Sequence, residues 1–151
     1  VDDPMEALRL AMAEIPQDCL LARSLRWAFA ECKNIHTYQE ARDAVDRRFP
    51  NMPIAHTLNN ACLTVFGIHL GGTDFTKVIS NTVAMGLDND CTAATAGSIV
   101  GAVIGKNRLP EHWYAPFHNR ICSYLNGIEE FAIDDTLARF KKQALQVVES
   151  R

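Results

Sequence analysis

The chain has 151 residues, of which 48% are hydrophobic and 22% charged, and its formal net charge is −3 at pH 7. These values are typical of an ordinary globular chain that is long enough to bury a core as one domain. The small negative charge gives no basis for a nucleic-acid partner. The sequence shows no charged-then-apolar leader pattern and no apolar run of membrane-spanning length, so we expect no membrane partner either.

Cysteine residues are scattered along the chain, and no two of them form a Cys-x-x-Cys pair: Cys19, Cys32, Cys62, Cys91 and Cys122. An odd number of cysteines without metal-ligand spacing supports neither a disulfide framework nor a zinc site. We therefore expect reduced thiols and a cytoplasmic location.

The spacing of apolar residues is helical almost throughout, which predicts an all-α fold. Asp3-Pro4-Met5-Glu6 is typical of a capped helix start, with the aspartate as N-cap and the proline as first helical residue. Pro16 would end this first helix. A second helix is predicted from about Cys19 to Lys33, with its apolar residues at helical spacing.

Three further helices are predicted in the middle of the chain. Thr37-Tyr38-Gln39-Glu40 is a capping-box pattern and opens a helix that should end near Phe49-Pro50. The next helix is expected from His56 to Phe66 and is closed by Gly67. Another is expected from Asp74 to Met85.

The sixth predicted helix, from Cys91 to Ile104, is marked by glycines at four-residue intervals, Gly97, Gly101 and Gly105. Because an interior glycine costs about 1 kcal/mol relative to alanine, we expect this helix to be central and its glycine face to be tightly packed. A membrane dimerisation motif is the alternative, but the segment is too short for it. A last helix is predicted from about Asp134 to Glu149.

The stretch with the most chemical information is Asp88-Asn89-Asp90, which follows Gly86 and precedes the small-residue run from Cys91 to Gly97. Two carboxylates at i and i+2 on a glycine-led turn can point at one position, where Mg²⁺ or Ca²⁺ is the natural occupant. The free N–H groups at the start of the following helix could bind an anion such as a phosphate.

The alternative interpretation gives both carboxylates a structural role, with Asp88 as a turn residue and Asp90 as a helix N-cap. The helix dipole by itself repels a cation, so metal binding requires that the two carboxylates outweigh it. Short Asp-x-Asp motifs are frequent, and their spacing alone does not decide between the two interpretations.

A wider part of the sequence resembles the ADP-ribosylglycohydrolase family. The segments that carry the resemblance are Asp74-Phe75, Ala84–Ala102 with the two aspartates, His56-Thr57-Leu58-Asn59-Asn60-Ala61 and Leu109-Pro110-Glu111-His112-Trp113. The similarity extends from about Met5 to Phe140. It implies an all-helical, orthogonal multi-helix bundle with two Mg²⁺ ions in a central cleft. It also implies hydrolysis of the glycosidic bond that joins ADP-ribose to a protein side chain or a small acceptor.

The resemblance further implies which residues hold the metal. Asp88 and Asp90 match the two metal-ligating aspartates of the family motif. Cys91 stands where a hydroxyl ligand is usual, and Asn89 stands where threonine is common. Since a thiol prefers softer metals than Mg²⁺, the third ligand departs from the family pattern. The metal-site candidates are therefore Asp88, Asp90 and Cys91, and no catalytic residue is identified.

A second acidic motif of the family, of the Thr-Asp-Asp type and near its amino terminus, has no match in the expected place. The early acidic residue that the family uses in catalysis is not found either. The chain begins at Val1 and is shorter than the family's full domain. We therefore expect residues 1–151 to be the carboxy-terminal part of a single ADP-ribosylglycohydrolase-like domain, with the missing amino-terminal part as its partner.

Other polar residues are given structural roles. Asp134-Asp135-Thr136 contains the acidic pair of the missing motif, but its position at the start of the last helix favours capping. His56, Asn59 and Asn60 are interpreted as structural residues near a helix start, although His56 could border the cleft. The predicted function is Mg²⁺-dependent hydrolysis of an ADP-ribosyl bond. The alternative is a non-catalytic ADP-ribose-binding or structural homologue.

Overall fold

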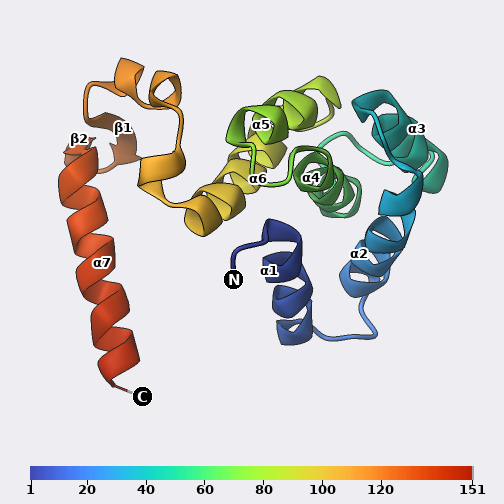
Figure 1. Cartoon of the computed structure of the whole chain (residues 1–151), viewed down its shortest axis with the longest axis horizontal. Helices are drawn as coiled ribbons and strands as arrows, with labels where there is room; N and C mark the ends of the chain where they lie inside the picture. Colours follow the sequence, from blue (N-terminus) through green and yellow to red (C-terminus); the bar gives the residue numbers. More distant parts are fainter. Residues whose placement is uncertain (151) are drawn as a thin grey trace. The chain divides into compact units, whose positions relative to one another are not determined.

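The computed structural model describes residues 1–150 and is mainly helical with one small two-stranded sheet, which confirms the predicted all-α fold class (Figure 1). The chain divides into two compact units, Val1–Leu109 and Pro110–Arg151. The first unit is built from α1 (Pro4–Ala11), α2 (Leu20–Glu31), α3 (Tyr38–Arg48), α4 (Thr57–Gly71), α5 (Phe75–Ala84) and α6 (Asn89–Ile104). Short 3₁₀ turns follow three of these helices, at Met12–Glu14, Cys32–Asn34 and Lys106–Arg108.

Side-chain caps fix the starts of several helices, as their sequence patterns predict. The Asp3 carboxylate accepts a hydrogen bond from the Met5 N–H at 2.9 Å and begins α1. In the capping box of α3, the Thr37 hydroxyl accepts from the Glu40 N–H at 3.2 Å, and the Glu40 carboxylate accepts from the Thr37 N–H at 3.0 Å. Asp74, which the sequence analysis did not assign as a cap, accepts from the Lys77 N–H at 3.0 Å at the start of α5. These bonds satisfy backbone N–H groups that a helix start leaves without a partner.

The core of the first unit surrounds α4, which packs against α1, α2, α3, α5 and α6. The apolar residues of this helix are not confined to one face, and Leu63, Phe66 and Ile68 are fully buried, as expected for a helix inside a core. Trp27 of α2 meets Phe49 and Phe66 edge-on, with ring centroids 5.8 Å apart in both pairs. We expected the glycine-rich helix α6 to be central, and that expectation is wrong, because α4 holds the central place.

Gly67 does not end the fourth helix, in contrast to the prediction. The helix continues to Gly71. A Cβ atom added at Gly67 would lie 1.9 Å from the Thr82 hydroxyl oxygen, so the glycine is needed for the close approach of α4 and α5. Glycine therefore acts here as a packing residue and not as a helix terminator.

The three glycines of α6 also differ from the prediction of one tightly packed face. A Cβ atom at Gly97 would lie 2.8 Å from Ile79, so this position is tightly packed as expected. At Gly101 the nearest atom, on Phe75, would be at 3.8 Å, which is ordinary contact. Gly105 is exposed and ends the helix with a φ of 74°, a conformation that favours glycine.

The second unit contains a hairpin that the sequence analysis did not predict. Strand β1 (Arg120–Leu125) pairs antiparallel with β2 (Ile128–Ala132), and α7 (Ile133–Glu149) follows. Leu125 faces Ile128, so Asn126-Gly127 forms the two-residue turn, with Gly127 at a φ of 77°. Asn-Gly between apolar residues is a strong hairpin signal. An irregular register between Cys122 and Leu125 disturbs the alternation of side chains that would have identified the strand.

No residue of the second unit, as far as Ser150, is buried. Two more 3₁₀ turns, Glu111–Trp113 and Ala115–Phe117, precede its hairpin. Within residues 1–150, no helix has both the length and the apolar character needed to cross a membrane.

Candidate metal centre

The candidate site lies where α5 passes into α6. Asp88, Asp90 and Cys91 each present a possible ligand atom there, and these atoms all lie within 4.8 Å of one another. Among residues 1–150, this is the only group of three or more His, Cys, Asp and Glu side chains with such spacing. Asp88 is half-buried, whereas Asp90 and Cys91 are exposed. This spacing would allow the three ligand atoms to contact one cation, and a metal at this position stays a prediction.

Asp88, and not Asp90, occupies the N-cap position of α6, because the helix begins at Asn89. The Asp88 side chain makes no capping hydrogen bond to the helix, and Asp90 lies in the first turn. The interpretation of Asp90 as the N-cap is therefore wrong. Cation binding by these carboxylates therefore does not require a capping hydrogen bond to be broken.

Cys91 lies close to both carboxylates and responds to them electrostatically. A hydrogen bond to Asp88 and the negative charges of Asp88 and Asp90 raise the pKa of the Cys91 thiol above its usual value. The thiolate is the nucleophilic form of cysteine and also its metal-binding form. A raised pKa therefore disfavours Cys91 as a nucleophile. All five cysteines of the chain are free.

The turn before α6 has an uncommon backbone conformation. Gly86 and Leu87 both have positive φ values, 73° and 58°. Leucine rarely adopts this left-handed conformation, so the structure around the turn must hold it in place. One local contact is made by the Asn89 side chain, whose Nδ2 donates to the Val83 carbonyl at 3.2 Å.

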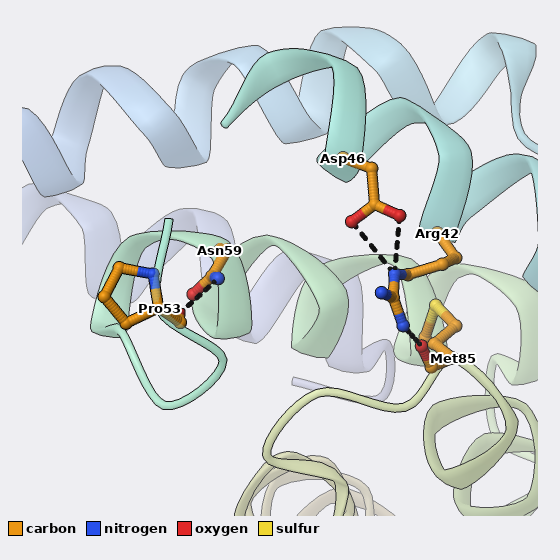
Figure 2. A network of polar contacts seen from close by, with 5 residues as sticks. All are labelled: Arg42, Asp46, Pro53, Asn59 and Met85. Carbon is orange, nitrogen blue, oxygen red and sulfur yellow. Dashed lines mark hydrogen bonds and ion pairs between the residues drawn. The ribbon is translucent and has the colours of Figure 1, made fainter. Parts of the chain in front are cut away.

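The segment around His56 supports the site from the amino-terminal end of α4. His56 is the N-cap of that helix. The Asn59 side chain donates to the Pro53 carbonyl at 3.0 Å (Figure 2). The Asn60 Oδ1 atom accepts from the Asp88 N–H at 3.3 Å. All three residues have structural roles, as predicted, and Asn60 reaches the metal-site turn directly.

Arg42 of α3 reaches the same turn and was not singled out in the sequence. Its Nη1 atom donates to the Met85 carbonyl at 2.9 Å (Figure 2). Its Nε atom lies 3.0 and 2.9 Å from the two carboxylate oxygens of Asp46. The only local signal is an Arg–Asp pair at i and i+4, which is common on helix surfaces. The long-range contact to Met85 cannot be inferred from such a pair.

Asp134, Asp135 and Thr136 lie in the first turn of α7, within the second unit. The helix start that the sequence predicted there is thus confirmed, but the predicted capping role is wrong, because these residues lie inside the helix and its start has no side-chain cap hydrogen bond. Ala132 occupies the N-cap position and provides no side-chain cap, and the Asn119 side chain accepts from the Asp134 N–H at 3.0 Å. These acidic residues are not part of the metal-ligand group.

The model of the family ADP-ribosylglycohydrolase matches residues 1–146, nearly the whole chain. This chain belongs to the ADP-ribosylglycohydrolase family. Comparisons with curated proteins and with solved structures gave no significant match. Membership of the ADP-ribosylglycohydrolase family indicates a hydrolase of this type and agrees with the all-α fold.

The donor set of this ADP-ribosylglycohydrolase chain fits Mg²⁺ in part. The carboxylates of Asp88 and Asp90 are hard oxygen donors of the kind that Mg²⁺ prefers. The Cys91 sulfur is a soft donor and suits other metals better. Mg²⁺ requires near-octahedral oxygen coordination, so water or residues outside this group must supply most of its ligands.

Proposed function

We propose that the chain forms part of a Mg²⁺-dependent hydrolase that cleaves the glycosidic bond between ADP-ribose and a protein side chain or a small acceptor. The supporting observation is the position of the Asp88 and Asp90 carboxylates, whose oxygen atoms lie within 4.8 Å of each other at the start of α6. The class of reaction comes from the family match over residues 1–146.

The two carboxylates and the helix start have complementary tasks in this proposal. Asp88 and Asp90 hold the cation, since neither is used as a side-chain cap of α6. The first N–H groups of α6 point out of the helix start, where they can bind a negatively charged group of the substrate. A bound Mg²⁺ would polarise the ribose hydroxyls and provide a template for the attacking water.

The remaining ligands and the general acid or base are part of the proposal. Two carboxylates on one turn make a weak Mg²⁺ site, because the ion releases its water ligands reluctantly. We propose, from the family resemblance, that the other ligands and the catalytic residue come from residues preceding Val1. Residues 1–151 alone should then bind Mg²⁺ weakly and show no turnover.

The alternative function is a non-catalytic homologue that binds ADP-ribose or has a structural role. The observation in its favour is Cys91, whose thiol stands among the candidate ligands and is hydrogen-bonded to Asp88. A protonated thiol completes no Mg²⁺ site. Binding of ADP-ribose without hydrolysis under any metal condition would favour this alternative.

The test is hydrolysis of an ADP-ribosylated protein by residues 1–151 alone and together with the upstream sequence. We expect Mg²⁺-dependent turnover only in the combined protein, and its loss in Asp88→Ala and Asp90→Ala. Circular dichroism should show that both variants keep their helical structure. Normal turnover in both variants would overturn the metal role of these residues. Efficient turnover by residues 1–151 alone would show that the missing ligands lie within the chain.

A further inference from the structure

The carboxylate pair depends on a turn that its own sequence does not favour. Two consecutive residues, Gly86 and Leu87, are left-handed, with φ values of 73° and 58°. Unlike glycine, leucine has a side chain that disfavours positive φ values, so Leu87 would adopt a negative φ more readily. A preference for the observed conformation must therefore come from contacts outside the turn.

Arg42 provides one such contact from α3, 43 residues before Met85. Its Nη1 atom donates to the Met85 carbonyl at 2.9 Å (Figure 2). The same nitrogen would lie 3.0 Å from a Cβ atom at Gly86, so the guanidinium lies directly against the turn. Both carboxylate oxygens of Asp46 bind Nε and fix the orientation of the guanidinium plane.

Asn60 provides the second contact from α4. Its Oδ1 atom accepts from the Asp88 N–H at 3.3 Å, and the side chain is buried. Its Nδ2 atom donates to the carbonyls of Ile54 and His56 at 2.7 and 2.9 Å. Because a carbonyl oxygen can only accept and an N–H can only donate, the amide nitrogen faces the two carbonyls and the amide oxygen faces the Asp88 N–H.

We propose that Arg42 and Asn60 are positioning residues that hold the Met85–Asp88 backbone so that the Asp88 carboxylate shares a cation with Asp90. Both contacts act on the backbone and leave the carboxylates free for the metal. They come from α3 and α4, which pack on each other within the first unit. The inference rests on the metal site of the proposed function. Loss of groups that hold a metal ligand in place commonly weakens metal binding about 10- to 100-fold.

The experiment uses Mn²⁺ as a paramagnetic probe in place of Mg²⁺ and follows the broadening of backbone amide signals near Asp88 and Asp90. This method measures weak binding, which suits a site with two carboxylates. The variants Arg42→Met and Asn60→Ala should raise the Mn²⁺ dissociation constant about tenfold or more. Arg42→Lys, which keeps a cationic donor for the Met85 carbonyl, should recover part of the affinity.

Matched controls separate positioning from general stability. Asn59→Ala removes the bond to the Pro53 carbonyl and the two bonds that Asn59 Oδ1 accepts from the N–H and Nδ2 of Asn60. It removes no contact with the turn, and the Asn60 amide keeps its shorter bonds to the Ile54 and His56 carbonyls. Arg120→Met removes an exposed arginine whose ion pair with Glu130 lies in the second unit. Each control should keep the Mn²⁺ affinity of the wild type within about twofold, and the thermal stability of every variant is measured beside its affinity.

Hydrogen exchange of the Asp88 amide without metal is the second measurement. Asn60→Ala should lower the protection of this amide, and Asn59→Ala should not. If the wild type binds Mn²⁺ and the variants Arg42→Met and Asn60→Ala bind it equally well, the positioning roles are overturned while the metal site stands. Absence of broadening near Asp88 in the wild type would overturn the metal site itself, and the inference with it.

Discussion

Cys91 is the residue at which this chain departs most clearly from a hard-metal site. Its sulfur lies among the candidate ligand atoms, and the neighbouring carboxylates keep it in the thiol form by raising its pKa. A thiol beside Asp88 can donate a hydrogen bond to the carboxylate, whereas a thiolate would repel it. At the scale of single residues, the site therefore consists of two oxygen donors and a protonated neighbour.

This arrangement predicts slow alkylation of Cys91. Because a raised pKa leaves less thiolate at a given pH, iodoacetamide should react slowly with Cys91 at about pH 8. Asp88→Asn removes the largest cause of the shift, so it should lower the Cys91 pKa and speed the reaction. The rate is measured by mass spectrometry of the peptide that contains Cys91. Cys122, which is also exposed, serves as an internal control whose rate should stay constant. Equal Cys91 rates in both proteins would contradict the prediction.

At the scale of helices, the glycines of this chain show how packing is distributed. Gly67 of α4 lies against Thr82 of α5, which is fully buried and donates its hydroxyl to the Val78 carbonyl at 2.7 Å. A Cβ atom added at Gly101 of α6 would make only an ordinary van der Waals contact with the Phe75 ring. Both glycines are interior helix residues, yet only the first is required by a neighbouring helix.

The two glycines form a matched pair for mutation. Gly67→Ala should destabilise the fold by about 1–3 kcal/mol, because the new methyl group overlaps Thr82 and forces α4 and α5 apart. Gly101→Ala should be neutral or stabilise by up to about 1 kcal/mol, since alanine favours the helix and space is present. Urea unfolding measures both changes. If the two variants have the same free energy of unfolding, the close approach of α4 and α5 does not require glycine at position 67.

The comparison of sequence and structure separates local signals from distant contacts. The caps Asp3 and Thr37 were predictable because their partners lie within three residues. The role of Gly67 was misassigned because a helix-ending glycine and a packing glycine look alike without the neighbouring helix. The bond from Asn60 to the Asp88 amide spans 28 residues, so the local pattern could identify Asn60 as structural without showing what it holds.

The hairpin is a different case, because the sequence signal that predicts it lies within the hairpin itself. Asn126-Gly127 between Leu125 and Ile128 favours a two-residue turn. The helical periodicity of the rest of the chain and the irregular register of β1 obscured it. Of the candidate site, the proximity of Asp88 and Asp90 followed from their spacing, while the contacts of Arg42 with the turn depended on the tertiary fold.

At the scale of the whole molecule, the two units differ in what stabilises them. The core cluster and the partly buried residues packed against it run from Met5 to Leu109, all within the first unit. In the second unit, as far as Ser150, no residue is buried, and a two-stranded hairpin is marginally stable by itself. Hydrophobic burial, the main source of folding free energy, thus belongs to the first unit.

This difference predicts that the units fold with unequal independence. Residues 1–109 alone should be helical and should unfold cooperatively in urea, because they contain the complete core cluster. Residues 110–151 alone should show no cooperative transition, since they bury too little apolar surface to offset the entropy of ordering the chain. Circular dichroism of the two pieces and of the full chain measures this directly. A cooperative transition in the second piece, or an unfolded first piece, would show that the stability of the chain is shared between the units.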